Sequence, residues 1–287
     1  MDRKDKYDHP GMWCQAHRMS LPEPNTDTIL CVPQKNGNVD WNLLMYQLWT
    51  GVLPKSAVEA KHFRGRYTYG STNVSSTSHV LFIARHPYSR LLSYYLDKVV
   101  ASHYSDRFPA LRKKAKFSEF VQYLHGRWVA EKLSSICILD HHLCAQVEGC
   151  YFPDAAETII LKHEDERSWI HCELKYRLNA DDAKLFDPDW RRRGFRNGPC
   201  FYEPDCHSNT TGGIITGSFH PTHASSPEVL EAHYDRNTAR LVNDLYAADF
   251  AILGYAKWDG QEPFFVANIT LHSSSSSSSS SSSESRS

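Results

Sequence analysis

The sequence predicts an α/β fold in which helices flank a central parallel sheet. Three short apolar segments, at residues 28–32, 79–84 and 157–162, have the length and composition of strands. Each of the first two runs into a short polar loop, after which a helical pattern begins. Strands that alternate with helices favour a parallel sheet with right-handed crossover connections.

Helical patterns are predicted over residues 40–49, 88–100, 117–131, 165–176 and 227–246. The second of these opens with Pro87, which suits the first turn of a helix, and a row of Leu and Tyr residues then gives it an apolar face. Residues 180–226 are rich in Gly, Pro, Asn, Asp and Cys, which predicts an irregular insertion of the kind that carries specificity. The serine-rich residues 273–287 are predicted to be disordered.

Composition indicates a globular chain that does not bind nucleic acid in bulk. Of the 287 residues, 41% are hydrophobic and 12% aromatic, which is enough for a sizeable core. The formal net charge of −1 argues against bulk nucleic-acid binding. Local basic clusters at residues 112–116 and 191–196 are either solvated faces or a rim for an anionic glycan.

The loop after the first predicted strand has the properties of an anion-binding loop. Asn36, Gly37 and Asn38 tolerate left-handed or close-approach backbone conformations, so that successive N–H groups can point at one oxyanion. The helix that follows adds its positive end, and Lys35 adds a mobile point charge. The Walker pattern G-x-x-x-x-G-K-[ST] is absent. A plain turn before a helix is the alternative, because Asn-Gly is a common turn dipeptide.

The loop after the second strand carries a second basic group. Arg85, Arg90 and Ser93 lie near the start of the next helix, where arginine forks and a serine hydroxyl match phosphate geometry. For Arg90 taken singly, an ion pair with a surface carboxylate is the alternative. Because parallel strands place ligands at their carboxyl ends, the two loops together predict a ligand with two separate anionic groups.

At these residues the chain resembles the Golgi carbohydrate sulfotransferases, the group that contains the HNK-1, chondroitin and dermatan sulfotransferases. Their first motif, roughly P-K-x-G/A-x-T-x-W, is matched by Lys35, Gly37 and Trp41. The chain departs from this motif at Gln34, which separates Pro33 from the lysine, and at Val39, which takes the place of the threonine. Their second motif, R-x-P-x-x-R-L-x-S-x-Y, is matched by Arg85, Pro87, Arg90, Leu91, Ser93 and Tyr95.

Three further segments resemble the same enzymes more weakly. Residues 140–146 are similar to the H-x-x-P-Q stretch of uronyl 2-O-sulfotransferase relatives, with Ala145 in place of the proline. Residues 158–165 resemble a later strand that ends in an acidic pair, and residues 249–255 resemble the D-F-x-x-x-G-Y close of the catalytic domain. The resemblance implies a sulfotransferase domain over residues 27–256, between an N-terminal extension (1–26) and a tail (257–287).

The resemblance implies a P-loop-like three-layer fold and transfer of a sulfuryl group from PAPS, 3′-phosphoadenosine-5′-phosphosulfate, to a hydroxyl of a glycan or polysaccharide. It assigns the 5′-phosphosulfate to the first loop and the 3′-phosphate to the second. The donor-binding residues are then Lys35, Asn36, Gly37, Asn38, Arg85, Arg90 and Ser93. Lys35 would stabilise charge on the leaving oxygen. His142, with His141 next and Glu164 after them, would take the acceptor proton. No metal is expected.

Family members are anchored in the Golgi membrane, so the resemblance also implies membrane association and a Golgi location. The sequence contains no apolar run of 18 or more residues and no signal-peptide core. Sequons that start at Asn73, Asn209 and Asn268 fit a secretory glycoprotein.

Eight cysteines are many for a cytosolic chain of this length. We expect local disulfides, Cys144–Cys150 and Cys200–Cys206, because each pair closes a short loop and the family works in an oxidising lumen. Zinc bound with the help of His141, His142 and His207 is the rival, which the absence of any C-x-x-C disfavours.

Two rival functions stay open. A P-loop-type kinase also uses a strand–loop–helix lysine, but it needs a Walker lysine followed by Ser or Thr and a metal carboxylate, and neither is evident. A catalytically impaired protein that binds PAPS or a glycan without turnover is compatible with the departures at Gln34 and Val39.

Overall fold

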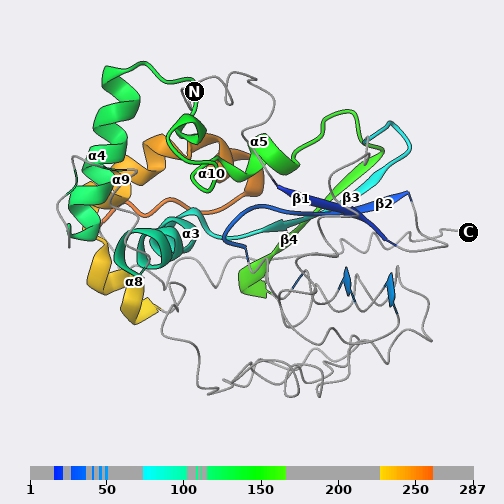
Figure 1. Ribbon diagram of the computed structural model, residues 1–287, viewed down its shortest axis with the longest axis horizontal. Coiled ribbons are helices and arrows are strands. Elements are labelled where there is room, and N and C mark those ends of the chain that lie inside the picture. The colour runs from blue at the N-terminus through cyan, green and yellow to red at the C-terminus, as the bar shows by residue number, and fades with distance from the viewer. Residues whose placement is uncertain are drawn as a thin grey trace, which may run out of the picture.

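The computed structural model describes residues 16–21, 27–36, 74–101, 115–165 and 227–260, together with positions 41, 45–46, 49–50, 108 and 111. This part of the chain contains a four-stranded sheet in the order β1-β2-β3-β4 (Figure 1). β1 (His17–Ser20) is antiparallel to β2 (Thr28–Val32), whereas β2, β3 (His79–Ala84) and β4 (Glu157–Lys162) are parallel. The predicted α/β class is confirmed, and the three predicted strands have the expected bounds.

The sheet separates two apolar cores. Val80 and Phe82 of β3 face a large core, while Leu81 and Ile83 face a smaller one that also contains Trp41. β3 is therefore buried on both faces, which explains why its sequence is a continuous apolar run and not an alternating one. The large core is completed by residues of α3 (Pro87–Tyr94), α4 (Phe117–Ala130), α8 (Pro227–His233), α9 (Arg236–Leu245) and α10 (Ala247–Leu253).

Two of the predicted helices differ in detail. The helix predicted over residues 88–100 is α3, which continues as the π-helical segment η2 (Tyr95–Ala101). The helix predicted over residues 227–246 is two helices: α8 ends at His233, and Asp235 caps the start of α9, where its side chain accepts a hydrogen bond of 2.7 Å from Thr238 N. Of the helix predicted over residues 165–176, only the first position is described, in the turn η5 (His163–Asp165).

Some predictions fall outside the described residues. These are the insertion at 180–226, the serine-rich segment and the asparagines of all three sequons. Strand β1 was not predicted, and it lies within the residues assigned to the N-terminal extension. Within the described part of the chain, no helix is long and apolar enough to cross a membrane.

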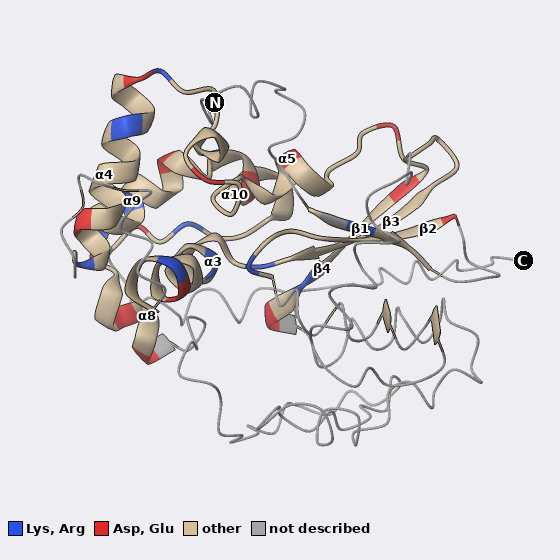
Figure 2. Cartoon of the chain, viewed as in Figure 1, with Lys and Arg blue, Asp and Glu red and all other residues tan. Residues whose placement is uncertain are grey.

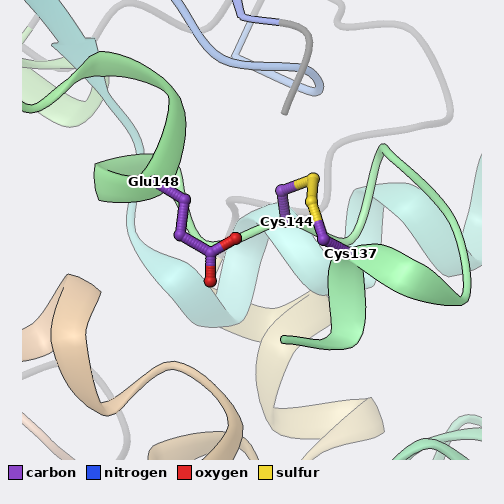
Figure 3. Close-up of side chains that lie close together, drawn as sticks. All are labelled: Cys137, Cys144 and Glu148. Carbon is purple, nitrogen blue, oxygen red and sulfur yellow. A yellow bond between two sulfur atoms is a disulfide. The ribbon is translucent and has the colours of Figure 1, made fainter. Parts of the chain in front are cut away.

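Among the described residues there are two disulfides, and neither is the predicted Cys144–Cys150 pair. Cys31 is bonded to Cys150, and Cys137 to Cys144. The predicted Cys144–Cys150 pair is wrong because helix α5 (Gln146–Cys150) separates the two cysteines and carries Cys150 to β2, where its Cα lies 5.7 Å from that of Cys31. Figure 3 shows the Cys137–Cys144 bond beside Glu148 of α5. The predicted Cys200–Cys206 pair lies outside the described residues.

Candidate anion-binding site

Three loops meet at the carboxyl ends of the parallel strands. The first follows β2 and contains Lys35, the second follows β3 at Arg85, and the third follows β4 at Glu164. Pairing of Cys31 with Phe82 and of Ala84 with Lys162 puts the three loops side by side. This edge of a parallel sheet is where α/β proteins place ligands.

Lys35 adopts a left-handed backbone conformation. Its φ of 69° is uncommon for a residue other than glycine. The turn is closed by a hydrogen bond of 3.3 Å from Asn36 N to Pro33 O. Non-glycine residues held in this conformation cluster at functional sites. The remainder of the predicted anion-binding loop, including Gly37 and Asn38, lies outside the described residues.

The Lys35 side chain is mostly buried, and its charge is balanced by one carboxylate. Nζ of Lys35 lies 2.7 Å from Oδ2 of Asp97, a residue of η2, and Nζ of Lys98 lies 3.2 Å from the same oxygen. Burial lowers the pKa of the Lys35 ammonium, and Lys98 and Arg85 add to this shift, whereas Asp97 opposes it. In Figure 2, basic and acidic positions lie next to each other on the coil formed by α3 and its continuation η2. The cations outnumber the carboxylate here, so the cluster favours an anionic ligand.

Arg85 connects the second loop to the first. Its Nη1 donates a hydrogen bond of 2.8 Å to the carbonyl oxygen of Lys35. The next residues start α3, where Pro87 occupies the first turn and His86 Nδ1 accepts a hydrogen bond of 3.3 Å from Tyr88 N. Burial lowers the pKa of His86 to about 3, so this imidazole is neutral near pH 7. The first turn of α3 has no acidic residue of its own, and the carboxylate of Glu164, which accepts a hydrogen bond of 2.7 Å from His86 N, lies at the positive end of the helix dipole.

Arg90 and Ser93 lie further along α3, and both are buried. Arg90 donates from Nε to Gln34 O at 3.0 Å and from Nη2 to His142 O at 3.1 Å. The structure thus gives Arg90 carbonyl partners and not the surface carboxylate considered from the sequence. Its guanidinium links three segments of the site.

Gln146 is the centre of a buried hydrogen-bond network that the sequence did not indicate. Its Oε1 accepts from Arg85 N at 2.8 Å and from Asn36 Nδ2 at 2.7 Å. Its Nε2 donates to Arg85 O at 2.8 Å and to Asp249 Oδ2 at 3.2 Å. Asn36 Nδ2 also donates to Ile83 O at 2.7 Å, so the Asn36 side chain points into the protein, between the loops. This network sets the spacing between the Lys35 and Arg85 loops.

Asp249 anchors the network from the C-terminal part of the chain. Its buried carboxylate accepts hydrogen bonds of 3.0 Å from the backbone N–H groups of both Gln146 and Val147 at the start of α5. Burial raises the pKa of Asp249, while the Arg90 charge and the N–H donors oppose that shift.

Asp249→Ala is expected to lower the free energy of unfolding, because it leaves buried N–H groups without an acceptor at about 1–3 kcal/mol each. Urea unfolding followed by circular dichroism measures the effect. Asp244→Ala is the matched control, since Asp244 lies on the neighbouring helix α9 with an exposed side chain. Equal midpoints for the two variants would show that the network contributes nothing to stability.

The two histidines predicted as bases lie in a loop closed by the Cys137–Cys144 disulfide. Oδ1 of the buried Asp140 accepts from His142 N at 2.8 Å and lies 2.7 Å from His142 Nδ1. This pairing puts a proton on Nδ1 and leaves Nε2 of His142 as the acceptor. The ring of His141 lies 3.9 Å from that of His142, centroid to centroid.

The carboxylate of Asp140 holds His142 in this orientation. Burial alone would raise the pKa of Asp140, but hydrogen bonds from the His142 side chain and backbone, together with both imidazoles, hold it well below its usual value. The sequence had indicated the histidines and missed the role of Asp140.

Two groups of side chains bear on the zinc alternative. The potential ligand atoms of Asp140, His141 and His142 lie within 4.8 Å of one another, as do those of Cys137, Cys144 and Glu148. In the second group the two sulfur atoms are bonded to each other, as Figure 3 shows, so neither is a thiolate ligand. His207, the third histidine considered from the sequence, lies outside the described residues.

Glu164, the remaining candidate base, is occupied by structural hydrogen bonds. Its Oε1 accepts from His86 N at 2.7 Å, and its Oε2 accepts from Tyr255 OH at 2.9 Å. The residue therefore holds the end of β4 against the start of α3.

Taken together, these features define an α/β protein with a basic edge at the carboxyl ends of its parallel strands. A family model described as "Sulfotransferase family" matches residues 30–188, more than half of the chain, and the chain belongs to this family. The matched span contains both basic loops and the His142 segment. Searches of the curated proteins and of the solved structures found no match. Family membership supports a transferase that moves a sulfuryl group from a sulfate donor to an acceptor.

Proposed function

We propose that this protein transfers a sulfuryl group from PAPS to a hydroxyl group of a carbohydrate, either a glycan or a polysaccharide. The observation that carries the proposal is the junction of two basic loops at one sheet edge, where Arg85 Nη1 donates to Lys35 O at 2.8 Å. PAPS has two separate anionic ends, the 5′-phosphosulfate and the 3′-phosphate. Two adjacent basic loops match that charge distribution.

Each loop has a distinct role in this proposal. Lys35 lies at the 5′-phosphosulfate, with Asn36, Gly37 and Asn38 completing the loop around it. Arg85, Arg90 and Ser93 serve the 3′-phosphate, Arg85 from just before α3 and the other two from within that helix. Arginine has five N–H donors, and the two hydrogen bonds of Arg90 to carbonyl groups leave N–H groups for a phosphate.

Transfer proceeds by in-line attack of the acceptor hydroxyl on sulfur. A bond forms between the acceptor oxygen and sulfur, while the bond between sulfur and the 5′-phosphate oxygen breaks and adenosine 3′,5′-bisphosphate leaves. Lys35 stabilises the negative charge that grows on the leaving oxygen. Nε2 of His142 accepts the proton of the hydroxyl, and Asp140, at 2.7 Å from Nδ1, holds the ring in the required tautomer.

The carbohydrate acceptor and the Golgi location rest on the resemblance of the second loop to carbohydrate sulfotransferases. Two disulfides among the described residues support an oxidising compartment such as the Golgi lumen. Membrane association and glycosylation are inferred from the same resemblance.

Arg85→Ala is expected to weaken binding of PAPS by about 1.5–3 kcal/mol, the contribution of one charge-assisted hydrogen-bonded contact. Binding of adenosine-5′-phosphosulfate, which lacks the 3′-phosphate, should change much less. Isothermal titration calorimetry with both nucleotides measures the preference between them.

Arg127→Ala serves as the control for Arg85→Ala, because Arg127 is paired with Glu131 on the exposed side of α4, away from the strand ends. If Arg85→Ala keeps the wild-type preference for PAPS over adenosine-5′-phosphosulfate, the assignment of the second loop to the 3′-phosphate is wrong.

A further inference from the structure

We propose that Asp97 is a positioning residue for Lys35, whose carboxylate holds the lysine side chain at the donor end of the site and keeps its ammonium group charged. The proposal rests on the proposed function, in which Lys35 acts on the leaving oxygen as a cation. Neither of the two donor motifs includes Asp97, and 62 residues separate it from Lys35 along the chain.

The geometry of the pair differs from that of an ordinary surface salt bridge. Lys35 Nζ and Asp97 Oδ2 are 2.7 Å apart, and the Lys35 side chain retains only 15% of its exposure, against 41% for Asp97. Exposed pairs contribute little, because both side chains must be ordered and water screens the charges. Here one partner is largely buried and extends from a backbone that the left-handed turn has already fixed. Asp97 therefore acts on a cation that water reaches poorly.

Asp97 is itself held in place by the segment that carries it. The π-helical segment η2 begins at Tyr95, whose hydroxyl donates a hydrogen bond of 2.6 Å to Ala115 O. The Tyr95 ring packs against Phe117 and Phe120 of α4. π-Helical turns inside α-helices are rare and frequently mark functional sites. The widened turn thus carries Asp97 from an anchored start to the Lys35 loop.

Burial and the neighbouring charges explain why the Lys35 ammonium needs a carboxylate partner. Three charged groups face its ammonium: Asp97 and Lys98 from η2, and Arg85 from the junction of β3 and α3. Burial and the two neighbouring cations all lower the pKa of Lys35, while Asp97 raises it. Replacing the carboxylate by a neutral amide removes the opposing effect, so the pKa falls further. The active, protonated form is present below this pKa and is lost as the pH rises through it.

The test is the pH profile of kcat/KM for PAPS in the full-length chain carrying Asp97→Asn. In Asp97→Asn, the alkaline limb of the profile should move to lower pH by about one unit. A close opposite charge shifts a pKa by about one to three units, and the partial exposure of Asp97 puts the expected shift at the low end of that range. Asp97→Glu should restore the wild-type position of the limb, since it restores the charge. Asp154→Asn, in the exposed turn before β4, should leave the profile unchanged.

A second measurement needs no turnover. Lysines are methylated with ¹³C-formaldehyde, the Lys35 signal is identified by its absence from Lys35→Arg, and its titration is followed by NMR. A lower titration midpoint in Asp97→Asn than in the wild type supports the proposal, and equal midpoints overturn it. A wild-type chain that transfers nothing from PAPS overturns the proposed function, whereas the NMR titration still decides whether Asp97 keeps Lys35 charged.

Discussion

Lys35→Ala is expected to lower the turnover rate of sulfate transfer by about 10²–10³-fold, the usual effect of removing one preorganised electrostatic contact to a developing charge. The structure places the Lys35 ammonium at the carboxyl end of β2, next to Arg85 and Asp97. In the proposed reaction this charge matters most when the leaving oxygen becomes anionic. PAPS binding should therefore weaken much less than turnover.

Lys132→Ala is a matched control for this experiment. Lys132 also has a left-handed backbone, with φ of 50°, but it is exposed and follows α4. Alanine carries a Cβ as lysine does, so the substitution adds no left-handed backbone strain at either position, and a loss of turnover seen only at position 35 belongs to the missing charge. Near-wild-type transfer by Lys35→Ala would refute the assignment of this lysine.

His142→Ala is expected to lower turnover by about 10²–10⁴-fold, the usual range for loss of a general base. PAPS affinity should hardly change, because in the proposed complex the imidazole meets the acceptor hydroxyl and not the nucleotide. Steady-state kinetics, together with calorimetric titration of PAPS, measure both effects.

His141→Ala is the internal control, and we expect a milder effect from it. The hydrogen bond from His142 Nδ1 to Asp140 also predicts that Asp140→Asn lowers turnover, because the amide no longer selects the same tautomer. A larger effect at His141 than at His142 would move the assignment to His141. Two mild effects would place the base elsewhere, and Glu164 would then need to exchange its hydrogen bonds to His86 N and Tyr255 OH for the acceptor.

The strands that carry the site were predictable because their burial dominates their composition. β3 is an unbroken apolar run, and burial on both faces requires such a run. β1 was missed because its four residues, His-Arg-Met-Ser, give no apolar pattern. The Arg18 side chain of β1 donates a hydrogen bond to Gly149 O. The break between α8 and α9 at Asp235 was missed because a periodic apolar pattern continues across it.

The partners of the site residues were not predictable, because they come from distant parts of the chain. Asp97 lies 62 residues from Lys35, and Asp249 lies 103 residues from Gln146. The disulfides show the same limit: equal local spacing suggested Cys144–Cys150, whereas Cys150 is bonded across 119 residues to Cys31. Spacing identifies residues of the right chemistry, but only the packed sheet and helices determine which of them meet.

The most direct test of the account is transfer of labelled sulfate from PAPS to a panel of glycans, with calorimetric binding of PAPS measured on the same preparation. We predict that the wild-type chain binds PAPS and labels at least one carbohydrate, and that Lys35→Ala binds PAPS but labels the same carbohydrate about 10²–10³-fold more slowly. Binding without transfer to any acceptor would instead identify a protein that holds the nucleotide without turnover. Absence of PAPS binding would contradict the central claim that the two basic loops form the donor site.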